Sequence, residues 1–152
     1  MKVATFGSIG IRLRAADTAR VDVGISLGFT FLVSDAAGAD DEIQAHLASR
    51  GYRNVAVYHN GSRAGMPRRN LGAWPTVLVR GSYTDKDARM CADADAGLAF
   101  WNGRSTGTAR NIGQLRRSGK KVRVVSPGTR PAPTAPVDPL VAALLEDAGG
   151  MA

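Results

Sequence analysis

Three glycine-containing segments each come directly after an apolar run, and their residue types could bind a phosphate group. The segments are residues 6–10 (FGSIG), 34–40 (SDAAGAD) and 101–108 (WNGRSTGT). Glycine removes the Cβ that would hold a phosphate away from the backbone, and free N–H groups at the start of a helix attract anions. The candidate phosphate contacts are Gly7, Ser8, Gly38, Gly103, Ser105, Gly107 and Thr108.

Each segment alone is ordinary turn chemistry, because glycine commonly follows a strand. Their shared position in the chain, after a strand, is what favours a binding site. None of them matches a strict nucleotide-binding motif: residues 101–108 lack the lysine of a P-loop, and residues 6–10 do not follow the G-x-G-x-x-G pattern. The sequence therefore argues against a nucleoside triphosphatase or an ordinary dehydrogenase.

Four further side chains could contact the same ligand. Arg69 and Asn70 belong to a long loop rich in Gly, Pro and Arg and could close over a phosphate, since Arg suits bidentate contact with it. Lys86 could neutralise the phosphate, and Trp101 could stack on a base. The alternatives are an exposed loop without a ligand, a solvated helix charge, and packing of a tryptophan at a strand end.

Asp40 and Asp35 are the candidate catalytic carboxylates, since either could activate water or stabilise positive charge on a ribose. Asp40 could instead cap a helix that begins near Asp41, and Thr106 could cap the helix after the third glycine segment. One cysteine and two histidines, with no partners near them in sequence, predict no metal site. We also expect no cofactor.

The pattern of apolar residues predicts the strands and helices that carry these candidate site residues. Apolar runs predict strands at residues 2–6, 30–34, 54–58, 98–101 and 121–125, with a weaker candidate at 76–79. Helical spacing predicts helices at about 15–27, 41–50 and 85–94, the last capped by Thr84 or Asp85, and another that ends at Ser118. This alternation is typical of an α/β fold, here a three-layer Rossmann-like domain with a mainly parallel sheet of about five strands. In such a sheet the three glycine segments gather at the carboxyl edge.

The 152-residue chain, 44% hydrophobic and 22% charged, has the composition of one globular domain. We expect this domain to span residues 1–126, followed by a Pro-rich linker at 127–139 and a C-terminal helix at 140–148. So short a helix must dock on its own domain or on a neighbouring subunit, and we expect a homo-oligomer. The single cysteine and the lack of a long apolar stretch predict a cytoplasmic protein without membrane contact.

A formal net charge of +7 points to negatively charged partners. Much of the positive charge lies late in the sequence, at Arg104, Arg110, Arg116, Arg117, Lys120, Lys121, Arg123 and Arg130. A polyanion or a phosphorylated small molecule would suit such a surface. A solvated helix face that contributes only to solubility explains the same residues equally well.

The order of the motifs resembles the SLOG superfamily, which includes the DprA DNA-processing proteins and the LOG phosphoribohydrolases. The matching features are Gly-Ser after the first strand, Gly-Ala-Asp after the second and Gly-x-x-x-Gly-Thr at residues 103–108. Residues 69–72 (RNLG), 83–90 (YTDKDARM) and 97–108 (GLAFWNGRSTGT) are similar to the YspA-like branch in particular. The resemblance covers about residues 1–126, and its most specific part is the stretch 83–125.

This resemblance implies a Rossmannoid domain that binds nucleotides, ADP-ribose-like molecules or nucleoside monophosphates. In LOG enzymes a Pro-Gly-Gly-x-Gly-Thr loop is followed, three residues after the Thr, by a catalytic glutamate. Here that position is Asn111, and residues 101–103 (WNG) replace Pro-Gly-Gly. Asn102 also stands where YspA-like relatives often carry Asp. The resemblance therefore does not extend to LOG-type hydrolysis.

Two functions remain from the sequence. The first is a domain that senses or processes a nucleotide-like ligand; if it is an enzyme, we expect it to cleave an N-glycosidic bond with Asp40 or Asp35. The alternative is a single-stranded DNA-binding protein that resembles DprA, based on the basic stretch 104–123. The aromatic residues available for stacking on bases are few, which ranks this alternative second.

Overall fold

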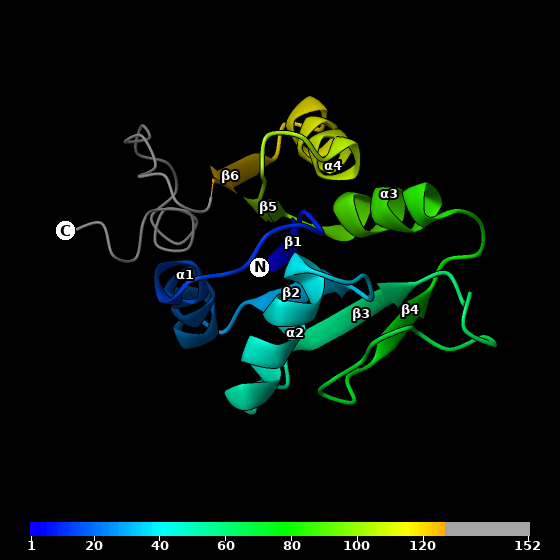
Figure 1. The fold of residues 1–152 in the computed structure, drawn as a ribbon, viewed down its shortest axis with the longest axis horizontal. Coiled ribbons are helices and arrows are strands. Elements are labelled where there is room, and N and C mark those ends of the chain that lie inside the picture. Colours follow the sequence, from blue (N-terminus) through cyan, green and yellow to red (C-terminus); the bar gives the residue numbers. More distant parts are fainter. Residues whose placement is uncertain (127–152) are drawn as a thin grey trace.

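The computed structural model describes residues 1–126, and within them six strands form one all-parallel sheet in the order β4-β3-β2-β1-β5-β6 (Figure 1). The strands are β1 (Lys2–Gly7), β2 (Thr30–Ser34), β3 (Val55–His59), β4 (Thr76–Leu78), β5 (Ala96–Phe100) and β6 (Lys121–Val125). The helices are α1 (Ala15–Ser26), α2 (Ala39–Ser49), α3 (Tyr83–Asp93) and α4 (Thr106–Arg117). The expected linker at 127–139 and helix at 140–148 lie outside the described residues.

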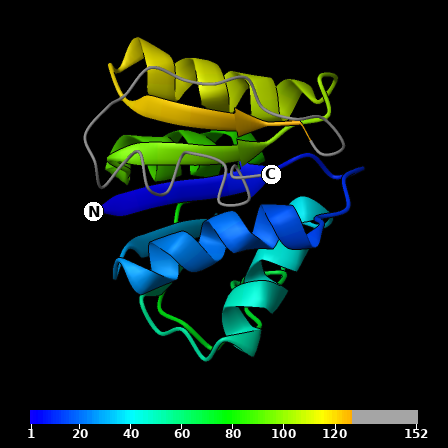
Figure 2. The same ribbon diagram turned by 90° about the vertical axis from the view of Figure 1, so that its left-hand side faces the viewer.

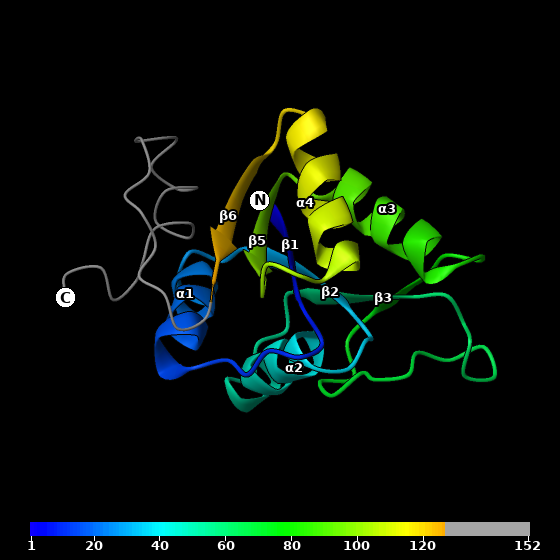
Figure 3. The same cartoon turned by 45° about the horizontal axis from the view of Figure 1, so that its top comes forward.

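Helices cover both faces of the sheet and make three layers. Helices α1 and α2 lie on one face, and α3 and α4 lie side by side on the other (Figures 1, 2 and 3). Neighbouring residues of a strand point to opposite faces, so Val3 joins the core under α1 and α2 whereas Ala4 joins the core under α3 and α4. A sheet buried on both faces explains why its central strands are continuous apolar runs.

The expected count of about five strands is short by one, because the weak candidate at 76–79 is a real strand. β4 pairs in parallel with β3 at the edge of the sheet and is only three residues long. Thr76 and Leu78 are exposed there, so β4 has no strongly apolar pattern. β5 begins at Ala96, two residues earlier than expected, because Ala96 and Gly97 pair with β1. Trp101 follows the strand rather than ending it.

Helix α3 begins earlier than the sequence suggested, and neither Thr84 nor Asp85 is its cap. Ser82 is the N-cap: its hydroxyl accepts the N–H of Asp85, and the Asp85 carboxylate accepts the N–H of Ser82. This reciprocal pair satisfies two backbone donors at once, which a cap at Thr84 would not do. None of the helices in residues 1–126 has the length and apolar character needed to cross a membrane.

Candidate functional site

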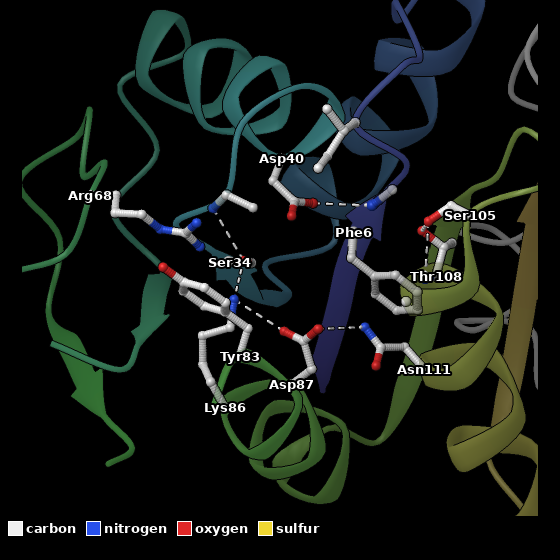
Figure 4. A pocket seen from close by; sticks show the side chains of 14 residues that line it. Phe6, Ser34, Asp40, Arg68, Tyr83, Lys86, Asp87, Ser105, Thr108 and Asn111 are labelled. Carbon is white, nitrogen blue, oxygen red and sulfur yellow. Dashed lines mark hydrogen bonds and ion pairs between the residues drawn. The ribbon is translucent and has the colours of Figure 1, made fainter. Parts of the chain in front are cut away.

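A cavity of about 210 Å³ lies at the carboxyl edge of the sheet, between the ends of β1 and β2 and the first turns of α3 and α4 (Figure 4). Because the strands are parallel, the segments that follow β1, β2 and β5 reach this same edge. The long loop between β3 and β4 closes one side of the cavity through Arg68. Each wall carries different polar groups, which decide what the cavity can bind.

The first turn of α4 forms a wall of hydrogen-bond donors. Ser105 is the N-cap and accepts the N–H of Thr108 at 3.4 Å; its hydroxyl also lies 3.1 Å from the Thr108 hydroxyl. The expectation that Thr106 is the cap is wrong, since Thr106 is the first residue inside the helix. The amides of Thr106 and Gly107 lie outside the helix's own ladder, and no group in residues 1–126 accepts from them.

The space next to the Gly107 Cα, beside this wall of donors, is empty. A Cβ built on this residue would meet no atom within 4 Å. The turn before it is held by Asn102, whose side-chain oxygen accepts the N–H groups of Arg104 and Ser105 at 2.9 and 2.8 Å. Backbone donors, a helix N-terminus and open space together suit an anion.

Asp40 forms the opposite wall, and its carboxyl group points into the cavity (Figure 4). One oxygen accepts the Gly7 N–H at 3.0 Å, and the residue is only 6% exposed. Burial raises the pKa of Asp40 to about 7, although the Lys86 charge opposes this rise and the Asp87 charge adds to it. The alternative role of Asp40 as a helix cap is wrong, because α2 begins at Ala39 with Gly38 as its N-cap.

A network of charged side chains forms the floor of the cavity. The Lys86 ammonium lies 2.6 Å from the Ser34 hydroxyl, 3.1 Å from Asp87 and 3.6 Å from Asp35, and it is 2% exposed. The Asn111 amide donates to the other oxygen of Asp87 at 3.3 Å. The carboxylates of Asp35 and Asp87 thus balance the charge of Lys86, so Lys86 adds little net positive charge to the cavity.

Arg68 and Asp35 fasten the long loop to the end of β2. The Arg68 guanidinium makes two hydrogen bonds to Asp35, at 2.8 and 3.2 Å, and the Arg68 N–H makes a third at 2.9 Å. Burial acts to raise the pKa of Asp35, but the Arg68 hydrogen bonds and the charges of Lys86 and Arg68 outweigh it and hold the pKa below its usual value. Arg68 also lies over the Tyr83 ring at 4.3 Å.

The structure brings together only some of the site residues expected from the sequence. Those that line the cavity are Gly7, Asp40, Lys86, Ser105, Gly107 and Thr108. Those that do not line it are Ser8, Asp35, Gly38, Arg69, Asn70, Trp101 and Gly103. The cavity thus lies at the edge of the sheet that the sequence analysis expected, but several of the expected side chains do not face it.

The residues outside the cavity are occupied by other contacts. The Ser8 hydroxyl accepts the Asn102 N–H at 3.2 Å, and the Trp101 indole donates to the Ser105 carbonyl at 3.0 Å. Arg69 lies 3.4 Å from Asp41, and the two ends of the Asn70 amide bond the Trp74 backbone. Arg69 and Asn70 therefore hold the long loop in place, and Arg68 is the loop residue that reaches the cavity.

Sequence reasoning did not select several residues that line the cavity, namely Phe6, Ile9, Ser34, Ala36, Arg68, Tyr83, Asp87 and Asn111. A signal existed for two of them. Tyr83 lies three positions before Lys86 and four before Asp87, so helical spacing places Tyr83 beside both of them. Asn111 occupies the position at which the SLOG resemblance places a glutamate.

The comparisons with known proteins bear on the fold. No family model matches the sequence, and no curated protein matches it. The X-ray structure of TM1055, a structural genomics target, is similar to this chain with a TM-score of 0.60 and 18% identity, over 80% of this chain and 71% of that chain. The fold is Rossmann-like. The expected three-layer α/β architecture is thereby confirmed, and the YspA-like branch stays a prediction.

The titratable side chains of the cavity do not resemble a metal centre. Within residues 1–126, no group of three or more His, Cys, Asp and Glu side chains is arranged to hold a metal ion. The chemistry available at the cavity comes from the α4 amides, from the hydroxyl groups of Ser34, Ser105 and Thr108, and from the carboxyl groups of Asp40 and Asp87.

Proposed function

We propose that the cavity binds a small phosphorylated ribose derivative, such as a nucleoside monophosphate or an ADP-ribose-like molecule. The observation that carries this proposal is the division of the cavity into a donor wall at α4 and an acceptor wall at Asp40 and Asp87. A phosphate needs donors, and sugar hydroxyls need acceptors within reach. A ribose phosphate carries both groups next to each other.

The phosphate would lie on the first turn of α4. The open amides of Thr106 and Gly107 and the hydroxyls of Ser105 and Thr108 would donate to its oxygens. Lys86 contributes less than expected from the sequence, because Asp35 and Asp87 already balance its charge. The helix N-terminus supplies the remaining attraction for the anion.

The sugar would lie between Asp40, Asp87 and Asn111. The volume of about 210 Å³ is below the range of about 300–1,000 Å³ typical of sites that enclose a whole drug-sized ligand. The cavity therefore suits the sugar and its phosphate, with the base extending toward Tyr83, whose ring is half-exposed. Arg68 covers the Tyr83 ring and would border the base.

If the ligand is a substrate, Asp40 would act as the general base in hydrolysis of the N-glycosidic bond. Its carboxylate would take a proton from water, the water oxygen would bond to C1′, and the base would leave with the electron pair of the broken bond. The proton held by Asp40 would then pass to the departing base, which restores the carboxylate. A carboxyl group with a pKa of about 7 suits this role near neutral pH. Asp40→Asn keeps an oxygen for the Gly7 N–H and should lower the hydrolysis rate by at least about 100-fold.

Calorimetry with the full chain tests binding. Ribose 5-phosphate, 5′-AMP, ADP-ribose and NAD are titrated separately, and adenosine serves as the matched control without a phosphate. We expect at least one phosphorylated compound to bind and adenosine to bind more weakly. The proposal fails if none of the phosphorylated compounds binds at millimolar concentration.

The second candidate, single-stranded DNA binding, is favoured by the charge on and around α4. Arg104, Arg110, Arg116, Arg117 and Lys121 are exposed, and none of them forms an ion pair with an acidic side chain in residues 1–126. Binding through them would weaken steeply as salt is raised. A gel-shift assay at low salt that shows no complex would remove this candidate.

A further inference from the structure

A second cavity, of about 730 Å³, lies beneath the loop that joins β3 to β4. It is lined by the end of β3, by the exposed side chains of β4 and by loop residues 63–67, Asn70 and Ala73. It shares no lining residue with the cavity described above. We call it the His59 cavity. Nothing in the proposed function depends on it.

The wall that the loop contributes is already in place. The Gln44 side chain, on α2, accepts the Leu71 N–H at 3.0 Å and donates to the Arg69 carbonyl at 3.3 Å. The Asn70 amide bonds the Trp74 backbone at both ends, and Trp74 is 3% exposed. A ligand entering this cavity would therefore meet a formed site, which lowers the cost of binding.

His59 presents an unused donor to this cavity. The residue is 3% exposed and lines the cavity at the carboxyl end of β3. Its Nδ1 accepts the Gly61 N–H at 3.2 Å, so the proton of the neutral ring lies on Nε2. No group in residues 1–126 accepts from Nε2, and Nε2 is not closed off from solvent. A ligand that carries a charged acceptor could therefore replace water at this donor, since a charge-assisted hydrogen bond is stronger than a neutral one.

The rest of the lining defines the ligand's chemistry. Met66, Pro67 and Leu78 supply apolar surface, and Arg63 supplies a positive charge at the exposed rim. No aspartate or glutamate lines the cavity. An anion therefore meets a donor and a cation there, without a carboxylate to repel it.

We propose that the His59 cavity binds a small monocarboxylate with an apolar body. The carboxylate would accept the His59 Nε2–H and face the Arg63 guanidinium, while the apolar body would pack on Met66, Pro67 and Leu78. A phosphate group suits this cavity less, because the lining is mainly apolar and offers no helix N-terminus.

Titration of benzoate into the ¹⁵N-labelled full chain tests the proposal, with benzyl alcohol as the uncharged control of similar shape. We expect saturable shifts of the Gly61, Ala64 and Ala73 amides with benzoate, and at least about tenfold weaker binding of benzyl alcohol, a difference of about 1.4 kcal/mol. The Gly107 and Thr108 amides should not move. Shifts confined to those two amides would place benzoate in the other cavity and overturn the proposal.

Two variants separate the donor from the charge. His59→Phe keeps a ring in the cavity but removes the donor. Arg63→Gln removes the charge but keeps a side-chain N–H group that can replace the Arg63 guanidinium as donor to the Arg68 carbonyl, a bond of 3.3 Å in the natural chain. Each should weaken benzoate binding about tenfold, whereas Arg12→Gln, which removes an exposed arginine elsewhere, should leave it unchanged. A cavity that holds only water would give no saturable shift, and that result, or benzoate binding that both His59→Phe and Arg63→Gln leave intact, overturns the proposal.

Discussion

The glycines at the end of β1 and after β2 serve packing, whereas a glycine at the start of α4 leaves space. A Cβ on Gly7 would come within 2.7 Å of both the Ala39 Cβ and the Phe100 carbonyl oxygen, and a Cβ on Gly38 would lie 2.2 Å from the Ile9 carbonyl oxygen. A Cβ on Gly107 would meet nothing within 4 Å. The fold demands the first two glycines, but it does not demand the third.

Glycine therefore has two different roles at this edge of the sheet: packing requires it at two positions, and at the third it leaves space that a ligand could fill. All three glycines lie at or beyond the carboxyl end of a strand, at the same edge of the sheet, so the sequence could not distinguish them. A glycine that packing requires says nothing about a ligand. A glycine beside open space and two unused amides is the one whose absence of a side chain could matter for binding.

The largest expected effect is on stability, at Gly38. The residue has φ +79° and its missing Cβ would meet the Ile9 backbone, so Gly38→Ala combines backbone strain with a clash. We expect the free energy of unfolding, measured by urea denaturation, to fall by about 3 kcal/mol. Gly28→Ala is the matched control: φ is also positive there, but no atom lies within 4 Å, so the loss should be smaller. Equal losses would contradict the packing role of Gly38.

The next effect is on ligand affinity, at Gly107. Gly107→Ala should leave the free energy of unfolding unchanged or raise it by up to about 1 kcal/mol, because the new methyl group meets nothing and alanine favours a helix. The methyl group would lie where the phosphate approaches, so calorimetry should show 5′-AMP binding about 30-fold more weakly, a change of about 2 kcal/mol. Unchanged affinity would place the phosphate elsewhere.

Asp35 and Asp40, the two carboxylates that follow β2, should make stability depend on pH in opposite directions. The pKa of Asp40 is raised to about 7 in the folded chain, so between its ordinary pKa and 7 the folded state binds more protons than the unfolded state. Its contribution to stability is therefore fully present at acidic pH and is lost as pH rises toward 7. The pKa of Asp35 is lowered, so the contribution of that group is lost at acidic pH instead.

Asp40→Asn removes the first of these dependences. Between pH 5 and pH 6 its free energy of unfolding should gain about 1.4 kcal/mol relative to the natural chain, the value of one pH unit for one proton. Urea denaturation of both proteins at the two pH values measures this gain. A difference between the proteins that does not change with pH would show that Asp40 titrates normally in the fold.

The smallest effect concerns the cap of α4. Ser105→Ala removes the hydroxyl that accepts the Thr108 N–H, and the free energy of unfolding should fall by about 1 kcal/mol. Thr106→Ala, one position inside the helix, should change it by less than about 0.5 kcal/mol because no cap is lost. The reverse order in thermal or urea denaturation would show that the helix begins one residue later.

The sequence predicted the fold well because most strands are buried on both faces and leave a plain apolar signal. β4 was the weak one, since two of its three side chains face solvent. Helix starts were harder to locate, because Ser82, Thr84 and Asp85 are all residue types that can cap, and the backbone geometry decides among them.

The candidate site was predicted only where topology alone places a residue. Gly7, Asp40 and Gly107 lie at the carboxyl edge because their strands are parallel. Arg68 was missed because long-range contacts, such as its pair with Asp35 and the bonds of Gln44, set the course of the loop between β3 and β4. No local pattern in the loop encodes those partners.

The amide resonance of Gly107 reports directly on whether phosphate binds at the first turn of α4. The ¹⁵N-labelled full chain is titrated with 5′-AMP, with adenosine as the control that lacks a phosphate. The resonances of the Thr106 and Gly107 amides should shift in a saturable manner with 5′-AMP and should not shift with adenosine. If both amides stay unmoved up to about 10 mM 5′-AMP, where even a millimolar ligand would fill most sites, the cavity does not bind phosphate through α4 and the account is contradicted.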